Sequence, residues 1–217
     1  MRRSVLKEVG LIKKQAKASS IFESLFGEKS FFDIEYKYPC EYIAKYWEQY
    51  KKSAFANTKN TNSLNGTIFE YIIQTLFIRE NLLPLYIQAK VAFVPNVEYD
   101  SILYSKEIGP IAFSMKTSLR ERYKQADLEA IALKYVHRKA RCFLLTLSEE
   151  EYATTKKKIA DGDIIGLDKV ILCTSPEMNQ LIFDLKQRTY ALSEQVEIVS
   201  GTHITSERIN RHVTNSQ

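Results

Sequence analysis

The stretch YIQAKVAFVPNVEYDSILYSKEIGPIAFSMKTSLRERYKQ, residues 86–125, decides the fold. It contains three short runs rich in apolar and β-branched residues, interrupted by proline and glycine: 86–94, 97–104 and 111–116. Three consecutive runs of this kind predict three strands in an antiparallel meander. From Arg120 to about Lys139 the apolar residues recur with helical spacing, which predicts a helix after the third strand.

The rest of the chain extends this pattern. Before the meander, the apolar run GTIFEYIIQTLFIREN predicts a helix over 66–81, capped by Asn65. After it, strands and helices are predicted to alternate: a strand at 142–147, a helix opening at Ser148, a strand at 170–174, a helix over 176–188 and a strand at 196–200. We therefore expect an α/β fold, with a mixed sheet of about five strands flanked by helices.

The length of 217 residues fits a single domain with its own core. We divide it into a helical N-terminal part at 1–62, an α/β core at 63–200 and a C-terminal tail at 201–217. Aromatic side chains are frequent between Phe31 and Tyr50 and are interleaved with lysines. This mixture favours helices packed on the core over a platform for stacking nucleic-acid bases.

Composition excludes several classes of protein. No apolar run is long enough to cross a membrane, and the basic first 20 residues lack the apolar segment of a secretory signal, so we expect a cytoplasmic protein with no membrane partner. Cys40, Cys142 and Cys173 are far apart and predict reduced core residues. There is no Walker A or GxGxxG motif, and none of the three histidines has metal-ligand spacing. His137 is predicted to be a packed structural residue.

The charge is unevenly distributed. The whole chain has a formal charge of +5, while residues 116–141 hold eight basic and three acidic residues and the first 20 hold six and one. Such clusters attract polyanions, although a solvated helix face produces the same count.

One set of polar residues in the meander can carry chemistry. Side chains alternate along a strand, so Asp100 shares a face with Glu98, and Lys116 emerges at the end of the third strand. Asp100, Glu70 and the backbone carbonyl of Met115 can together hold Mg²⁺, which prefers hard oxygen ligands. Lys116 would then orient or deprotonate an attacking water, a layout suited to metal-assisted phosphodiester hydrolysis.

Each residue also has a simpler interpretation. Glu70 shares a helix face with Thr67 and Gln74, which in isolation is a solvated polar stripe. Asp100 can be a turn residue and Lys116 a surface lysine.

The segment KTSLRERYKQ, residues 116–125, favours the chemical interpretation. In combination with Glu70 and Asp100 it resembles the type II restriction endonucleases of the PD-(D/E)xK superfamily, over about residues 63–147. Many of these enzymes have an acid on a helix, an aspartate on the second strand and a lysine ending the third. The resemblance implies a restriction-endonuclease-like core, Mg²⁺ as cofactor, and Glu70, Asp100 and Lys116 as catalytic residues.

The sequence departs from the family pattern at three positions. Ser114 stands where a second acid is usual, and Glu129 is a candidate to replace it as a metal ligand, with Glu70 the stronger candidate. Pro95 is not adjacent to Asp100. Tyr123 replaces the usual tryptophan, which concerns packing.

Arg122 is expected to bind the scissile phosphate through its planar guanidinium, or else to pair with Glu129 or Glu98. We expect further DNA contacts from polar side chains near the site and in a polar loop at 57–65: Arg120, Lys124, Gln125, Asn60 and Asn62. The segment 202–212 is a second candidate for a loop that reads bases.

The function expected from these residues is that of a type II restriction endonuclease, which cuts both strands of double-stranded DNA at a short specific sequence. The resemblance implies a homodimer and a companion DNA methyltransferase. A structure-selective repair or junction-resolving nuclease of the same fold is one alternative. A non-catalytic nucleic-acid-binding protein that uses only the basic segment is the other.

Overall fold

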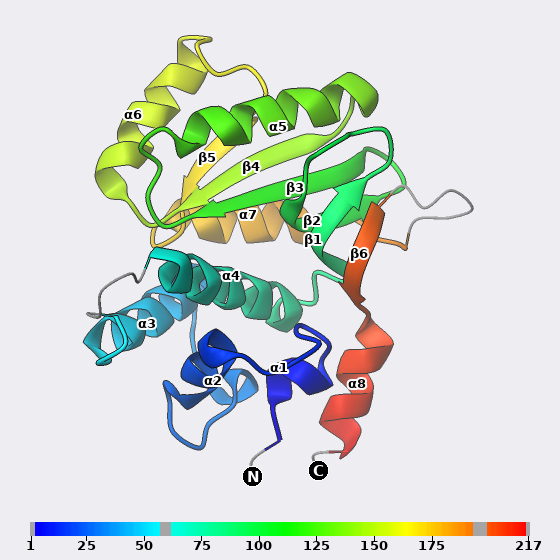
Figure 1. Ribbon diagram of the computed structural model, residues 1–217. Helices are drawn as coiled ribbons and strands as arrows, with labels where there is room; N and C mark the ends of the chain where they lie inside the picture. Colours follow the sequence, from blue (N-terminus) through cyan, green and yellow to red (C-terminus); the bar gives the residue numbers. More distant parts are fainter. Residues whose placement is uncertain (1–2, 57–61, 193–198, 216–217) are drawn as a thin grey trace.

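A computed structural model describes residues 3–56, 62–192 and 199–215. Its centre is a six-stranded mixed sheet in the order β5-β4-β3-β2-β1-β6 (Figure 1). The strands are β1 (Leu85–Val91), β2 (Tyr99–Ser105), β3 (Gly109–Lys116), β4 (Arg141–Thr146), β5 (Lys169–Leu172) and β6 (Val199–Ile204). The mixed α/β architecture expected from the sequence is confirmed, with six strands instead of about five.

The meander predicted from residues 86–116 is present. β1 pairs with β2 and β2 with β3, both antiparallel, whereas β4 and β5 add to β3 in parallel. Parallel neighbours need a crossover, and the helices α5 (Arg122–Val136) and α6 (Glu149–Ala160) provide the two crossovers.

Helices cover both faces of the sheet (Figure 1). One face carries α5, and the other carries α4 (Asn62–Arg79) and α7 (Pro176–Lys186). The N-terminal part packs on the outside of α4 and consists of α1 (Val5–Glu8), α2 (Lys17–Ser24), the 3₁₀ turn η1 (Phe31–Asp33) and α3 (Pro39–Lys52).

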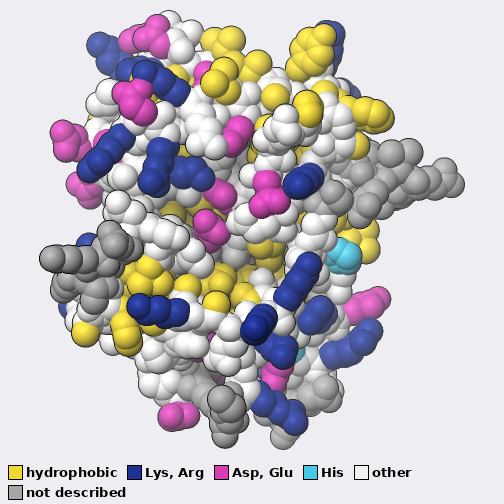
Figure 2. Space-filling model, in the orientation of Figure 1, with side chains coloured by type: hydrophobic (Ala, Val, Ile, Leu, Met, Phe, Trp, Pro, Cys, Tyr) yellow, Lys and Arg dark blue, Asp and Glu magenta, His cyan; other side chains and the backbone are white. Residues whose placement is uncertain are grey.

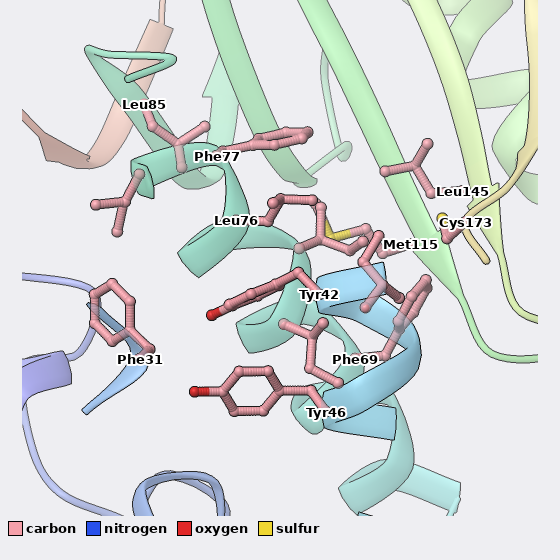
Figure 3. Close-up of a cluster of buried hydrophobic side chains, with 14 of the residues drawn as sticks. Phe31, Tyr42, Tyr46, Phe69, Leu76, Phe77, Leu85, Met115, Leu145 and Cys173 are labelled. Atoms are coloured by element: carbon pink, nitrogen blue, oxygen red, sulfur yellow. The ribbon is translucent and has the colours of Figure 1, made fainter. Parts of the chain in front are cut away.

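Helix α4 is buried from two sides, which explains why it is apolar around most of its circumference. It lies between the sheet and the N-terminal helices, and its side chains meet both in one cluster (Figure 3). Tyr42 and Tyr46 of α3 are buried in this cluster, and the Tyr42 hydroxyl donates to Thr75 Oγ1 of α4 at 2.9 Å. The expectation that the aromatic residues near the N-terminus pack in the core is confirmed.

Three local predictions differ from the structure. Helix α4 begins at Asn62, so Asn65 is inside the helix instead of capping it, and it accepts a hydrogen bond from the Tyr50 hydroxyl at 2.6 Å. The segment 202–212 is not a loop, and the stretch 201–217 is not a plain tail. It contains the end of β6 and the helix α8 (Ser206–Asn215), because β6 finds an antiparallel partner in β1.

Helix α8 is tied to the N-terminal part. Arg208 Nε donates to the carbonyl of Glu8 at 3.0 Å, and His212 Nδ1 lies 2.8 Å from a carboxylate oxygen of the same glutamate. Among the described helices, none is long and apolar enough to span a bilayer.

Candidate active site

Strands β2 and β3 separate at the point where Asp100 lies. Their pairing ends at Ser101 and Phe113, although β3 continues to Lys116. The Asp100 carboxylate accepts the hydrogen bond of the Met115 N–H, at 2.6 Å on Oδ2. The Lys116 ammonium donates to the same oxygen at 3.0 Å, and the two side chains are only 14% and 21% exposed. The predicted meeting of carboxylate and ammonium at the strand end is therefore observed.

Helix α4 brings Glu70 to the same place. One turn further along, Gln74 is buried, with 1% of its surface exposed, and its amide donates to the Asp100 carbonyl and to Ser101 Oγ, both at 3.3 Å. These bonds fix α4 against β2 beside Asp100. The stripe formed by Glu70 and Gln74 is therefore not a solvated helix face.

Glu70 carries an unfavourable charge in this environment. Burial, and then the nearby negative charge of Asp100, raise the pKa of Glu70 to about 7, although Lys116 acts in the opposite direction. A carboxylate whose ionised form is disfavoured in this way is stabilised by any cation that can enter the site.

Glu129 approaches from the other face of the sheet. It lies on α5, and its backbone carbonyl accepts from the Tyr99 hydroxyl at 2.9 Å, which ties the helix to the start of β2. Burial raises the pKa of Glu129. Gln125 and Lys116 oppose that rise, and Asp100 adds to it. The structure thus brings Glu129 within the electrostatic reach of both Asp100 and Lys116.

Mg²⁺ fits this donor set in number and kind. Among the residues that the structure describes, no three His, Cys, Asp or Glu side chains converge closely enough to hold a metal ion by themselves. Mg²⁺, however, is commonly held by one or two carboxylates and keeps several waters. Asp100 together with Glu70 or Glu129 satisfies that requirement, and the repulsion between their charges favours a divalent cation.

The connection from β3 to α5 is held by one carboxylate. Glu151, in the first turn of α6, accepts from the backbone N–H groups of Leu119 and Arg120, each at 2.6 Å. Burial alone would raise the pKa of Glu151, but these bonds hold it below its usual value. Arg120 has a φ of 35°, so the chain turns sharply here, and α5 starts at Arg122 instead of Arg120.

The residues expected to contact DNA are found in several settings. Arg120, Arg122 and Lys124 are exposed at the beginning of α5, and Lys124 forms an ion pair with Glu121. Gln125 is also exposed, and its amide donates to Glu129 Oε1 at 2.7 Å. Asn62 is exposed in the first turn of α4, and Asn60 lies outside the described residues.

The basic segment 116–141 has fewer positive charges free to bind a polyanion than its composition indicates. Four of its eight basic residues are paired with carboxylates: Lys116 with Asp100, Lys124 with Glu121, and Lys134 and Arg141 with Asp168. Figure 2 shows acidic side chains gathered across the middle of one face, with lysine and arginine side chains on both sides of them. An acidic centre between basic flanks suits a polyanion whose reacting group is brought to a metal ion.

Other sequence predictions concern residues outside the site. Cys142 and Cys173 are buried free thiols and Cys40 is a half-buried one. His137 ends α5, is half-buried, and has its pKa lowered by burial, in agreement with a structural role. Tyr123 packs under Lys158, whose Nζ lies 4.4 Å from the centre of the ring.

Sequence reasoning missed one residue at the site. Gln88 of β1 donates from Nε2 to Glu70 Oε2 at 3.1 Å. A single glutamine inside an alternating strand gives no signal of this kind, because the contact depends on how α4 crosses the sheet.

Comparison with solved structures addresses the fold. The complex of restriction endonuclease PspGI with its substrate DNA contains a chain similar to this one, with a TM-score of 0.53 and 16% sequence identity. The similarity covers 82% of this chain and 86% of that chain. No protein-family model and no curated protein sequence matches the chain. The resemblance read from residues 116–125 is thus confirmed at the level of architecture: the chain has a restriction-endonuclease-like fold.

Proposed function

We propose that this protein is a Mg²⁺-dependent endonuclease that hydrolyses phosphodiester bonds in double-stranded DNA at a short specific sequence, as type II restriction endonucleases do. The observation that carries the proposal is the separation of β2 from β3, which is filled by an Asp100 carboxylate bound to Lys116 and to the Met115 N–H. The fold shared with a restriction endonuclease that was solved with its substrate DNA supports the same conclusion.

In this proposal Asp100 and Glu70 are the carboxylates that hold Mg²⁺, with the Met115 carbonyl as a further oxygen ligand and Glu129 as a second acid on α5. The two hydrogen bonds that position the Asp100 carboxylate both fall on Oδ2. Bound Mg²⁺ supplies a Lewis acid that stabilises the negative charge of the phosphate under attack.

The side chains of the protein position the attacking water and the phosphate. Lys116, fixed by Asp100, orients the attacking water and offsets charge on the phosphate. The water loses a proton as its oxygen bonds to phosphorus, one P–O ester bond breaks, and the leaving oxygen takes up a proton, so that the strand is left with one phosphate end and one hydroxyl end. Arg122, exposed at the start of α5, is proposed to bind a phosphate oxygen through its planar guanidinium.

We also propose a homodimer, since two strands of a duplex are cut efficiently by two active sites. A companion DNA methyltransferase would protect the host DNA at the same sequence.

The test uses purified protein and long unmethylated duplex DNA, incubated with Mg²⁺ or with EDTA and analysed on a gel. Discrete fragments that require Mg²⁺ are expected. Lys116→Ala should fold normally and lose activity by about 10²- to 10⁴-fold, the usual contribution of a positioned proton-transfer or water-orienting group. Asp100→Ala should behave in the same way.

Three results would contradict the proposal. Cleavage of Lys116→Ala at the parental rate would show that the site is misassigned. Cleavage that depends on branches or flaps in the DNA would favour the structure-selective nuclease of the same fold. Binding that is weakened by salt, with intact DNA under every condition, would favour a non-catalytic nucleic-acid-binding protein.

A further inference from the structure

Gln88 has an unusual backbone conformation. Its φ is 47°, in the left-handed region that residues other than glycine rarely adopt. The pairing of β1 with β6 is irregular between Ile87 and Lys90, so Gln88 lies in a β-bulge. Bulges of this kind are frequent next to active sites, where they redirect a side chain, and strained residues persist only where the surrounding structure holds them.

The bulge places Gln88 beside the carboxylates. On the other side of β1, Ile87 pairs with Ser101 and Ala89 with Tyr99, which puts Gln88 opposite Asp100. The Gln88 amide then reaches α4 and donates to Glu70 Oε2 at 3.1 Å. Gln88 thus lies on the strand next to Asp100 and donates a hydrogen bond to Glu70.

The chemistry of the donor is informative. An amide N–H holds one carboxylate oxygen without adding a positive charge, so the negative charge of Glu70 stays available to a cation. A lysine or arginine in the same place would compete with that cation. Gln125 donates the same kind of bond to Glu129 at 2.7 Å. The carboxylates of Glu70 and Glu129 are therefore both held by neutral amides.

We propose that Gln88 is a positioning residue, which fixes the Glu70 carboxylate beside Asp100 in the orientation that the reaction requires. This inference rests on the proposed function, because the orientation matters only if Glu70 takes part in catalysis. Partners that orient a ligand carboxylate typically change metal affinity or activity by about 10- to 100-fold when they are removed.

Two substitutions separate positioning from stability. Gln88→Met keeps the length of the side chain and removes the donor. Gln88→Gly removes the side chain and also relieves the left-handed backbone. The matched control is Phe93→Gly, since Phe93 has a φ of 64° and is 83% exposed in the turn after β1.

We expect kcat for duplex DNA to fall about 10- to 100-fold in both Gln88 variants, with KM unchanged. Phe93→Gly should raise Tm, because it relieves a left-handed backbone, and should keep the parental kcat. Gln88→Gly gains the same relief but loses the bond to Glu70, so its Tm should stay close to the parental value while kcat falls. A fall in kcat without a fall in Tm would not be produced by a structural role alone.

A second measurement does not depend on cleavage. Urea unfolding of Gln88→Met, Glu70→Ala and the double variant, in metal-free protein, forms a double-mutant cycle. We expect the two substitutions to be non-additive by about tenfold in the unfolding equilibrium constant, which is about 1.4 kcal/mol.

The outcomes distinguish the two proposals. Additive effects in the cycle, or parental kcat in Gln88→Met, would overturn the role of Gln88 and leave the nuclease proposal intact. If the parental protein cuts no DNA with Mg²⁺, the proposed function is wrong and the catalytic role of Gln88 is wrong with it, whatever the cycle shows.

Discussion

Replacing Glu70 by glutamine should stabilise the protein above neutral pH, although it removes a residue that we place in the active site. Glu70 has a pKa of about 7 in the folded chain against an ordinary value of 4.5, because it is half-buried and lies near Asp100. Glutamine has the same shape and keeps a side-chain oxygen that can accept from Gln88. The substitution therefore removes the half-buried charge and little else.

The magnitude follows from the two pKa values. A carboxyl group whose pKa is higher in the folded state than in the unfolded state favours folding only while it is protonated. Its contribution is complete below pH 4.5 and is lost as the pH rises through about 7. At about 1.4 kcal/mol for each pH unit, the loss reaches about 3 kcal/mol at pH 8.

The assay is urea unfolding of the parental protein and Glu70→Gln, followed by far-UV circular dichroism from acidic to mildly alkaline pH without metal. We expect equal stability in acid and an advantage for Glu70→Gln of up to about 3 kcal/mol at pH 8. Added Mg²⁺ should stabilise the parental protein more than the variant, since bound ligand stabilises the folded state by mass action. Glu107→Gln, at an exposed position in the turn between β2 and β3, is the control.

A difference between the two proteins that is independent of pH would refute this reasoning. So would a lower stability of Glu70→Gln at pH 8, because it would mean that the ionised carboxylate is well solvated or well paired in the folded protein.

Three further substitutions test how the site is supported. Glu151→Ala should lower the free energy of unfolding by about 2 kcal/mol at neutral pH, because it leaves the N–H groups of Leu119 and Arg120 without their acceptor. The pKa of Glu151 is lowered in the folded state, so the difference in stability from the parental protein should shrink in acid. Asp168→Asn should cost a similar amount in urea unfolding, because it weakens the bonds to Lys134 and Arg141. It should leave kcat unchanged, because Arg141 is at the start of β4, whereas Lys116 lies beside the end of that strand. Gly166→Ala should cost about 3 kcal/mol in the same assay, since its β-carbon would lie 2.4 Å from the Asp127 carbonyl oxygen. Gly66→Ala is the control, because nothing lies within 4 Å of the carbon that it adds, and an equally small change at Gly166 would contradict the packing.

The sequence by itself determined the order of the elements. Alternation in 86–116, helical spacing after Arg120 and the apolar run after Gly66 are local patterns, and each corresponds to an element of the structure. The chemistry of the strand ends was also predictable, because Asp100 and Lys116 are polar residues at positions where a strand would otherwise continue. The meander then requires them to be neighbours.

Only the tertiary structure decided which other groups join them. Glu70 and Gln74 form a polar stripe that a solvated helix would show equally well. In the folded chain Gln74 is buried and bonds to Ser101, so the stripe faces β2 and not the solvent. Gln88 owes its contact to a bulge in the pairing of β1 with β6, and α8 is held by contacts of Arg208 and His212 with Glu8. These features depend on contacts between segments distant in the chain, whose register and crossing no local spacing records.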